Sequence, residues 1–253
     1  MGTALITGAS AGLGEEFAWQ LAAARHHLVL VARRRDRLEA LAHQIEQACG
    51  VEVEVLPADL SIAEDVQRVA QRLRDPQRPV GLLVNNAGFG RGKPFLSGDF
   101  DEERRGLKVM VEAVMELTRA AGEAMVERGR GAILNVSSVA SDTGMGTYSA
   151  HKAWVKAFSE GLAEELRGSA VTVTAVMPGM VNTDFHERTA VDVSQVAAVS
   201  WISAEAVVSQ ALDAVRRGQV LVTPTLRYKL TTQVVKFAPR WAVRAVTRRI
   251  PHM

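Results

Sequence analysis

Residues 7–14 read Thr7-Gly8-Ala9-Ser10-Ala11-Gly12-Leu13-Gly14. This turn stands between an apolar run at residues 4–7 and a helical pattern at about residues 12–25. Glycine lets a backbone turn tightly and approach a ligand closely. A helix that begins at such a turn presents free N–H groups and the positive end of its dipole. The placement of the turn between strand and helix therefore predicts a pyrophosphate site.

Strand and helix patterns alternate along the rest of the chain. Strands separated by helices pair in parallel through right-handed crossovers. We therefore predict an α/β fold with a doubly wound parallel sheet of the Rossmann type, as a single domain over residues 1–225 with a basic helical tail over 226–253. Ser61 and Glu64 suggest that one helix begins with a capping box. The predicted strands are 4–7, 28–31, 51–55, 80–84, 132–136, 171–176 and 219–222, and the predicted helices are 12–25, 34–49, 61–74, 101–128, 148–167 and 204–217.

The composition is that of a globular protein with a sizeable core, because 47% of the 253 residues are hydrophobic and 23% are charged. The formal net charge is only +2, so we expect no nucleic-acid partner. A single cysteine, Cys49, excludes an intrachain disulfide and favours a reducing, cytoplasmic location. We expect no secretory signal, and no apolar run reaches the ~20 residues of a transmembrane helix.

Basic character is concentrated in the tail. Residues 227–253 hold seven Lys or Arg and no acidic residue, which leaves 23 basic and 28 acidic residues elsewhere. Arg240, Arg244 and Arg248 recur every four residues, with Trp241 and Ala245 offset by one. Three interpretations remain open: a solvated helix face, a dimerisation helix, or a basic amphipathic helix in peripheral contact with an anionic membrane surface.

Four further motifs accompany the glycine turn, whose spacing is G-x-x-x-G-x-G rather than the common G-x-G-x-x-G. The four motifs are Asp59-Leu60, Asn85-Asn86-Ala87-Gly88, Tyr148-Ser149-Ala150-His151-Lys152, and Pro178-Gly179 with Thr183. In this combination the sequence resembles the short-chain dehydrogenase/reductase family, from its start to about Thr223. The resemblance implies a small-molecule carbonyl or alcohol substrate and a homodimer or homotetramer.

The end of the second strand indicates which cofactor is bound. An acidic residue there would bond the ribose 2′-hydroxyl of NAD(H) and repel a 2′-phosphate. This chain has Ala32 followed by Arg33, Arg34 and Arg35. Guanidinium groups suit a phosphate by charge and by geometry, so we predict NADP(H), with Arg33 as the first contact and Arg34 as the second.

The resemblance implies the rest of the cofactor site. Asp59 would bond the adenine amine, and Leu60 would contribute a backbone contact. Thr183 would bond the nicotinamide carboxamide. The predicted cofactor residues are Gly8, Ser10, Gly12, Leu13, Gly14, Arg33, Arg34, Asp59, Leu60, Asn86, Ala87, Gly88, Tyr148, Lys152, Pro178, Gly179 and Thr183.

A carbonyl reduced by NADPH also needs a proton donor. Tyr148 and Lys152 stand at i and i+4 on one helix, so we expect the ammonium to lower the pKa of the phenol from its ordinary ~10. The resemblance makes Tyr148 the general acid, gives Lys152 the nicotinamide ribose, and gives Ser138 the substrate oxygen. The histidines show no metal-ligand spacing, so no metal is expected. These residues predict an NADPH-dependent carbonyl reductase.

Two departures from the family pattern favour a second hypothesis. Met110 stands where the family usually has an asparagine that anchors a proton relay, and a thioether is at best a weak acceptor. Ser138 and Tyr148 are ten residues apart, a few fewer than usual. The alternative is therefore a catalytically weak NADP(H)-binding protein with a regulatory or interaction role. Residues 183–203 are expected to cover the substrate, and the apolar run 191–202 hints at a hydrophobic one.

Overall fold

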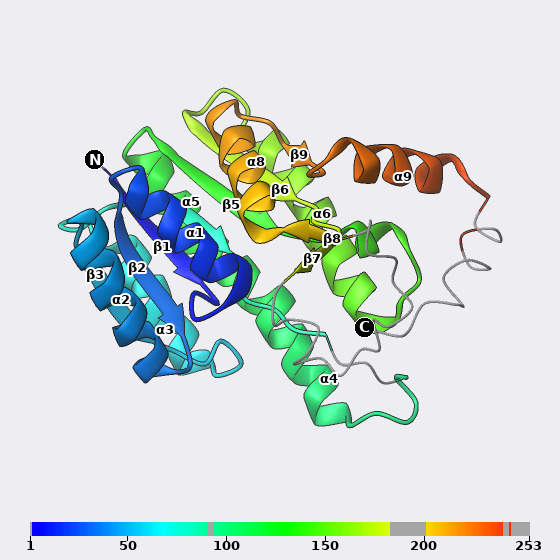
Figure 1. The fold of residues 1–253 in the computed structure, drawn as a ribbon, viewed down its shortest axis with the longest axis horizontal. Coiled ribbons are helices and arrows are strands. Elements are labelled where there is room, and N and C mark those ends of the chain that lie inside the picture. The colour runs from blue at the N-terminus through cyan, green and yellow to red at the C-terminus, as the bar shows by residue number, and fades with distance from the viewer. Residues whose placement is uncertain (1, 91–93, 183–200, 240–242, 244–253) are drawn as a thin grey trace.

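Seven parallel strands form the central sheet of the computed structural model, which describes residues 2–90, 94–182, 201–239 and 243 (Figure 1). Their order is β3-β2-β1-β4-β5-β6-β9, so the sheet winds outward in both directions from β1 and β4. This confirms the predicted doubly wound fold, which places a ligand crevice at the carboxyl ends of β1 and β4. The strands are β1 (Thr3–Thr7), β2 (His27–Ala32), β3 (Val53–Pro57), β4 (Val80–Asn85), β5 (Gly131–Val136), β6 (Val171–Val176) and β9 (Leu221–Val222).

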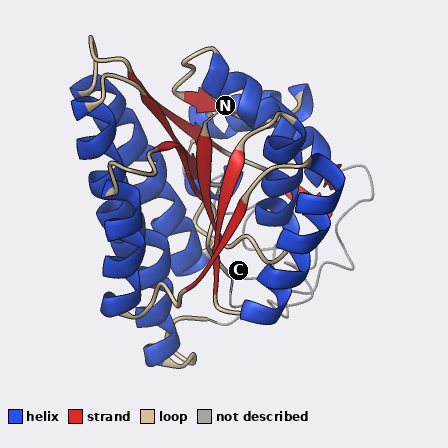
Figure 2. Ribbon diagram, turned by 90° about the vertical axis from the view of Figure 1, so that its left-hand side faces the viewer, coloured by secondary structure: helices blue, strands red, loops and turns tan. Residues whose placement is uncertain are grey.

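Helices cover both faces of the sheet (Figure 2). Each face has its own core, and β2 shows why its sequence is continuously apolar. Leu28 and Leu30 point into one core, whereas Val29 and Val31 point into the other. One face is covered by α1 (Gly12–Ala23), α2 (Arg35–Cys49) and α8 (Ala204–Arg216), and the other by α3 (Ala63–Arg74), α5 (Ala113–Glu127) and α6 (Gly146–Glu165).

The predicted helix over 101–128 is interrupted. It consists of α4 (Phe100–Leu107), a π-helical turn η1 (Lys108–Glu112) and then α5. Met110 lies at the middle of the π turn. Such turns are rare and occur frequently at functional sites. The irregularity therefore falls at the position where the sequence departs from the family pattern.

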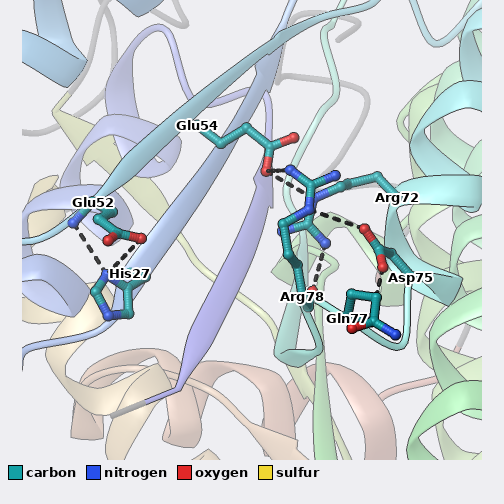
Figure 3. A network of polar contacts seen from close by, with 7 residues as sticks. All are labelled: His27, Glu52, Glu54, Arg72, Asp75, Gln77 and Arg78. Carbon is teal, nitrogen blue, oxygen red and sulfur yellow. Dashed lines mark hydrogen bonds and ion pairs between the residues drawn. The ribbon is translucent and has the colours of Figure 1, made fainter.

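An ion-pair network fixes α3 across the edge strand β3 (Figure 3). Arg72 is buried, its Nε lies 2.8 Å from Glu54 Oε2, and it donates through Nη1 to the Arg78 carbonyl at 2.7 Å. Arg78 also pairs with Asp75. A buried guanidinium is stable only when it is paired, so this network keeps α3 in place against β3. Asp59 lies in the loop that connects these two elements.

Several local features differ from the sequence prediction or were absent from it. The capping box at Ser61 is wrong: α3 begins at Ala63 with Ile62 as its N-cap, and Ser61 donates instead to Asp59. A 3-10 turn, η2 (Val139–Asp142), follows β5, and a two-stranded parallel sheet pairs β7 (Met180–Asn182) with β8 (Trp201–Ser203). These segments of three or four residues are too short for their sequences to show a helix or strand periodicity, so the sequence did not predict them.

The C-terminal part contains a helix, α9 (Leu226–Phe237). Apart from Val243, the helix predicted around Arg240–Arg248 lies outside the described residues, as do Thr183 and the apolar run up to residue 200. Among the helices that the structure does describe, none has the length and apolarity needed to cross a membrane.

Candidate active site

The glycine turn connects β1 to α1 in a backbone conformation that only glycine accepts easily. Gly8 and Gly12 have φ angles of 67° and 58°. A Cβ on Gly14 would lie 2.2 Å from the Gly8 carbonyl oxygen. No side chain caps the first N–H groups of α1, whose N-cap is Ala11. The turn is therefore a cradle whose backbone donors are available to an anion.

The segment after β4 is fastened to this turn. Thr7 Oγ1 accepts from the backbone N–H of Asn86 at 3.0 Å and of Ala87 at 3.1 Å. The Asn86 amide donates to the Thr7 carbonyl at 3.0 Å, and a Cβ on Gly8 would lie 2.9 Å from Ala87 Cα. Thr7 was not among the predicted site residues, although it ends the apolar strand with a polar side chain. It joins two predicted parts of the cofactor site.

A buried amide network lies just beneath these segments. Asn85 donates through Nδ2 to Thr118 Oγ1 at 3.0 Å and to Asn135 Oδ1 at 2.9 Å. Asn135 donates in turn to Ser159 Oγ at 2.9 Å. All four side chains are buried. The network links β4, β5, α5 and α6 in one hydrogen-bonded chain, which no sequence pattern indicated.

Two of the arginines after β2 lie on the cofactor side. Arg34 donates from Nη2 to Ser10, at 3.3 Å from its carbonyl oxygen and 3.2 Å from its hydroxyl. Arg33 is exposed, and its charge contributes to lowering the pKa of Asp59. Both positive charges therefore lie beside residues that were predicted to bind the cofactor.

Asp59 holds a more crowded position than the sequence suggested. Its Oδ1 accepts from the backbone and hydroxyl of Ser61, and its Oδ2 lies 2.8 Å from Arg105 Nη2 on α4. Burial opposes ionisation, but the Ser61 hydrogen bonds and the Arg105 and Arg33 charges hold the pKa of Asp59 below its usual range. Arg105, which was not predicted, already contacts the carboxylate assigned to the adenine amine.

The predicted catalytic residues meet at the carboxyl end of β5. Ser138 caps η2 by accepting from the Ala140 N–H at 3.1 Å, and it is hydrogen bonded to Tyr148. Lys152 donates from Nζ to the Val136 carbonyl at 2.7 Å, and this Nζ lies 5.7 Å from the centroid of the Tyr148 ring. The short spacing between Ser138 and Tyr148 is thus compatible with their contact.

The pKa values differ from the sequence prediction. Burial raises the pKa of Tyr148 to about 12, and only the Ser138 hydrogen bond lowers it. Burial lowers the pKa of Lys152 to about 8. The prediction that Lys152 lowers the pKa of Tyr148 is wrong for this structure, because both side chains are buried and the ammonium bonds a carbonyl.

Met110 fills the space beside Lys152. A Cβ on Gly88 would lie 3.4 Å from Lys152 Nζ and equally far from Met110 Cγ and Sδ. A Cβ on Gly106 would lie 3.5 Å from both Met110 Cε and His151 Cε1. The methionine is buried. An apolar group therefore occupies the position from which the family's relay asparagine would reach the lysine side of the site.

Pro178 and Gly179 lie between β6 and β7, and the Pro178 carbonyl accepts from the N–H of Val139, the residue after Ser138, at 3.0 Å. Tyr228 of α9 lies against this segment, because a Cβ on Gly179 would lie only 2.1 Å from its Cζ. The Tyr228 hydroxyl accepts from the Met180 N–H at 3.1 Å. No sequence signal pointed to Tyr228, since its contact with Met180 joins parts of the chain 48 residues apart.

Within the described parts of the chain, no group of three or more His, Cys, Asp or Glu could hold a metal ion.

A glycine cradle and a Ser–Tyr–Lys group, of which Tyr148 and Lys152 are buried, at one edge of a parallel sheet define a nucleotide-binding oxidoreductase. The family model described as short chain dehydrogenase matches residues 2–194, and the chain belongs to this family.

Two relatives and one solved structure show which members of the family the chain is similar to. The chain is 35% identical over 188 residues to a very-long-chain 3-oxoacyl-CoA reductase of Anas platyrhynchos, a match that covers 71% of this chain and 60% of that protein. It is 33% identical over 186 residues to the NADP-dependent 3-hydroxy acid dehydrogenase YdfG of Salmonella typhi, covering 72% and 73%. A short-chain dehydrogenase from Sphingobium yanoikuyae in complex with NADPH superposes with a TM-score of 0.86 at 34% identity, covering 99% of this chain and 96% of that one.

Proposed function

We propose that the protein is an NADPH-dependent reductase that converts a ketone or aldehyde to an alcohol, with Tyr148 as the general acid. The observation that carries this proposal is the contact of Ser138 with Tyr148, beside Lys152, at the sheet edge that holds the glycine cradle. The names of two relatives, a 3-oxoacyl-CoA reductase and a 3-hydroxy acid dehydrogenase, support chemistry that interconverts a carbonyl and an alcohol.

The residues present fit the cofactor. The cradle requires glycine at positions 8 and 14, where a side chain would collide with the backbone. Arg33 and Arg34 would hold the 2′-phosphate, and Asp59 would hold the adenine amine. NADPH, when bound, supplies the hydride. We propose that the other predicted cofactor residues also contact NADP(H). They are Ser10, Gly12, Leu13, Leu60, Asn86, Ala87, Gly88, Pro178, Gly179 and Thr183.

The chain's own residues then handle the proton. With a pKa of about 12, Tyr148 carries its proton at neutral pH and can donate it to the oxygen as that oxygen becomes an alkoxide. Ser138 would orient the same oxygen. Lys152 stays mostly protonated at pH 7, and we assign it to the nicotinamide ribose. A proton from solvent restores the phenol, which balances the reaction.

A carbonyl panel tests the proposal. Purified protein is mixed with ketones, aldehydes and 3-oxoacyl thioesters, with NADPH and NADH compared side by side. We expect NADPH oxidation with at least one substrate, and a loss of kcat of at least about 100-fold in Tyr148→Phe with NADPH binding retained. Tight NADPH binding without turnover across the panel would instead favour the second candidate, a catalytically weak NADP(H)-binding protein, which the buried Met110 supports.

We also propose that the protein is a homodimer or homotetramer. Leu107, at the end of α4, and Met115, near the start of α5, are 42% and 47% exposed, and a second copy of the chain would cover them. Light scattering coupled to gel filtration measures the oligomeric state, and a monomer at micromolar concentration would contradict this part.

A further inference from the structure

The helix α9 has two different faces. Tyr228 and Thr232 lie on its inner face, where Tyr228 meets Gly179 and Thr232 donates to the Tyr228 carbonyl at 2.6 Å. The outer face holds an apolar stripe of residues spaced four, four and three apart, which is the spacing of one side of a helix. The stripe consists of Leu226, Leu230, Val234 and Phe237, which are 77%, 68%, 68% and 81% exposed.

Side chains of this size are seldom so exposed together on a soluble surface unless the surface binds something. The stripe is the densest group of exposed large apolar side chains on any one described helix. Figure 1 shows α9 as an outlying helix beyond β9, at the edge of the domain. Its outer face is therefore accessible to a large, flat partner.

Charge indicates which partner. Arg227 and Lys229 flank the stripe and are exposed. Residues 227–253 hold seven Lys or Arg and no acidic residue. A second copy packed about a two-fold axis would place the same basic segment against itself, which is repulsive. An anionic lipid surface offers apolar depth for the stripe and negative headgroups for the basic side chains.

We infer that α9 is an interfacial helix that docks the protein on anionic lipid membranes. The stripe inserts at the headgroup boundary, and Arg227 and Lys229 lie at headgroup level. This assigns the contact to a described helix, rather than to the arginines at positions 240, 244 and 248. Because α9 also contacts η2, which follows Ser138, and meets Gly179, docking would bring the candidate active site next to the bilayer. The inference concerns binding and does not depend on the proposed activity.

Vesicle co-sedimentation of the full chain tests the inference. We expect binding to phosphatidylcholine vesicles that contain about 30% phosphatidylglycerol, and much weaker binding to pure phosphatidylcholine or in about 0.5 M salt. Leu230→Ser with Phe237→Ser, and separately Arg227→Glu with Lys229→Glu, should each lower the partition coefficient at least about tenfold.

Matched controls separate this effect from a general loss of surface apolarity or charge. Ile62→Ser with Val126→Ser removes two exposed apolar side chains elsewhere, and Arg167→Glu with Arg217→Glu reverses two exposed charges elsewhere. Both controls should bind vesicles like the wild type. Circular dichroism and thermal unfolding check that every variant is folded.

Three outcomes would overturn the inference: no binding to anionic vesicles, equally tight binding to pure phosphatidylcholine, or binding that the α9 variants leave unchanged. A different occupant would be indicated if the wild type is an oligomer that does not bind vesicles and light scattering shows that Leu230→Ser with Phe237→Ser is a smaller species. In that case a second copy of the chain covers the stripe. Turnover of a water-soluble carbonyl by the same samples reports on the proposed activity separately, so either idea can fail alone.

Discussion

Lys152 Nζ lies 5.7 Å from the centroid of the Tyr148 ring, and the two residues are only 4% and 8% exposed. Both would be less costly to bury as neutral groups, which is why their pKa values move in opposite directions. Burial therefore favours the protonated tyrosine and the neutral lysine. A charged lysine at this position lowers the stability of the folded chain, and shifted pKa values of this kind are common at functional sites.

This arrangement predicts how stability depends on pH. The folded pKa of Lys152, about 8, lies below its ordinary value of 10.5, so protonation of Lys152 disfavours the folded chain below pH 8 and ceases to do so above pH 10.5. The raised pKa of Tyr148 acts above pH 10, where stability falls as pH approaches 12. We therefore expect Lys152→Met to be more stable than wild type at pH 7, by about 1–3 kcal/mol.

The advantage of Lys152→Met should shrink as pH rises from 8 to 10, because the wild-type lysine is then neutral. Urea unfolding at pH 7, 8, 9 and 10 measures the difference in the free energy of unfolding. A difference that stays constant over this range would show that burial does not control the lysine's charge.

Cofactor preference should depend on the first two arginines of the run and not on the third. Arg33→Ala with Arg34→Ala removes two charges beside Ser10 and Asp59, so kcat/KM for NADPH should fall about 10–100-fold while that for NADH changes little. Arg35→Ala is the matched control, since Arg35 pairs with Glu39 on its own helix at 3.2 Å. An equal loss with both cofactors in the double variant would contradict recognition of the 2′-phosphate.

Met110→Asn tests whether the missing relay limits the reaction. The new amide would lie where the thioether now packs, next to Lys152, so we expect kcat to rise severalfold. Burying an amide without full hydrogen bonding should also cost about 1–3 kcal/mol of stability. Met110→Leu keeps the volume but adds no polar group, and it should give no gain. If Met110→Asn gives none either, the proton follows another route.

Hydrophobic periodicity and short motifs were sufficient to predict the strands, the helices and the glycine turn. They did not predict features that depend on contacts between distant segments. Continuous apolar runs such as 28–31 predicted buried strands, because both faces of a parallel sheet are covered. The glycine spacing predicted the cradle, since Gly8 and Gly14 admit no side chain. Tyr148 and Lys152 were predicted to lie together because they are four residues apart on one helix, whereas Ser138 was assigned through the resemblance to the family.

Features that depend on the tertiary environment escaped prediction. The sign of the Tyr148 pKa shift depends on burial, which the i, i+4 spacing with Lys152 does not report. The Arg105–Asp59 pair and the Tyr228–Gly179 contact each join segments that are far apart in the sequence. The π turn at Met110 interrupts a helix whose apolar periodicity gave no sign of it.

The buried amide network gives the last prediction. Asn135→Leu keeps a similar volume but leaves the Asn85 amide without one of its acceptors and Ser159 without a donor, so it should cost about 2–4 kcal/mol. Asn85→Leu should cost a similar amount for the same reason. The double variant removes both partners of the 2.9 Å bond, so its cost should be smaller than the sum of the two.

Urea unfolding of the wild type and the three variants measures this coupling as a double-mutant cycle. A coupling of at least about 1 kcal/mol is expected for two buried groups in direct contact. Strict additivity would mean that the two asparagines act independently, through Thr118 and Ser159. Since Ser159 lies on α6 with Tyr148, the single variants should also lower kcat more than they change the KM for NADPH. A pure stability effect would leave kcat of the folded fraction unchanged.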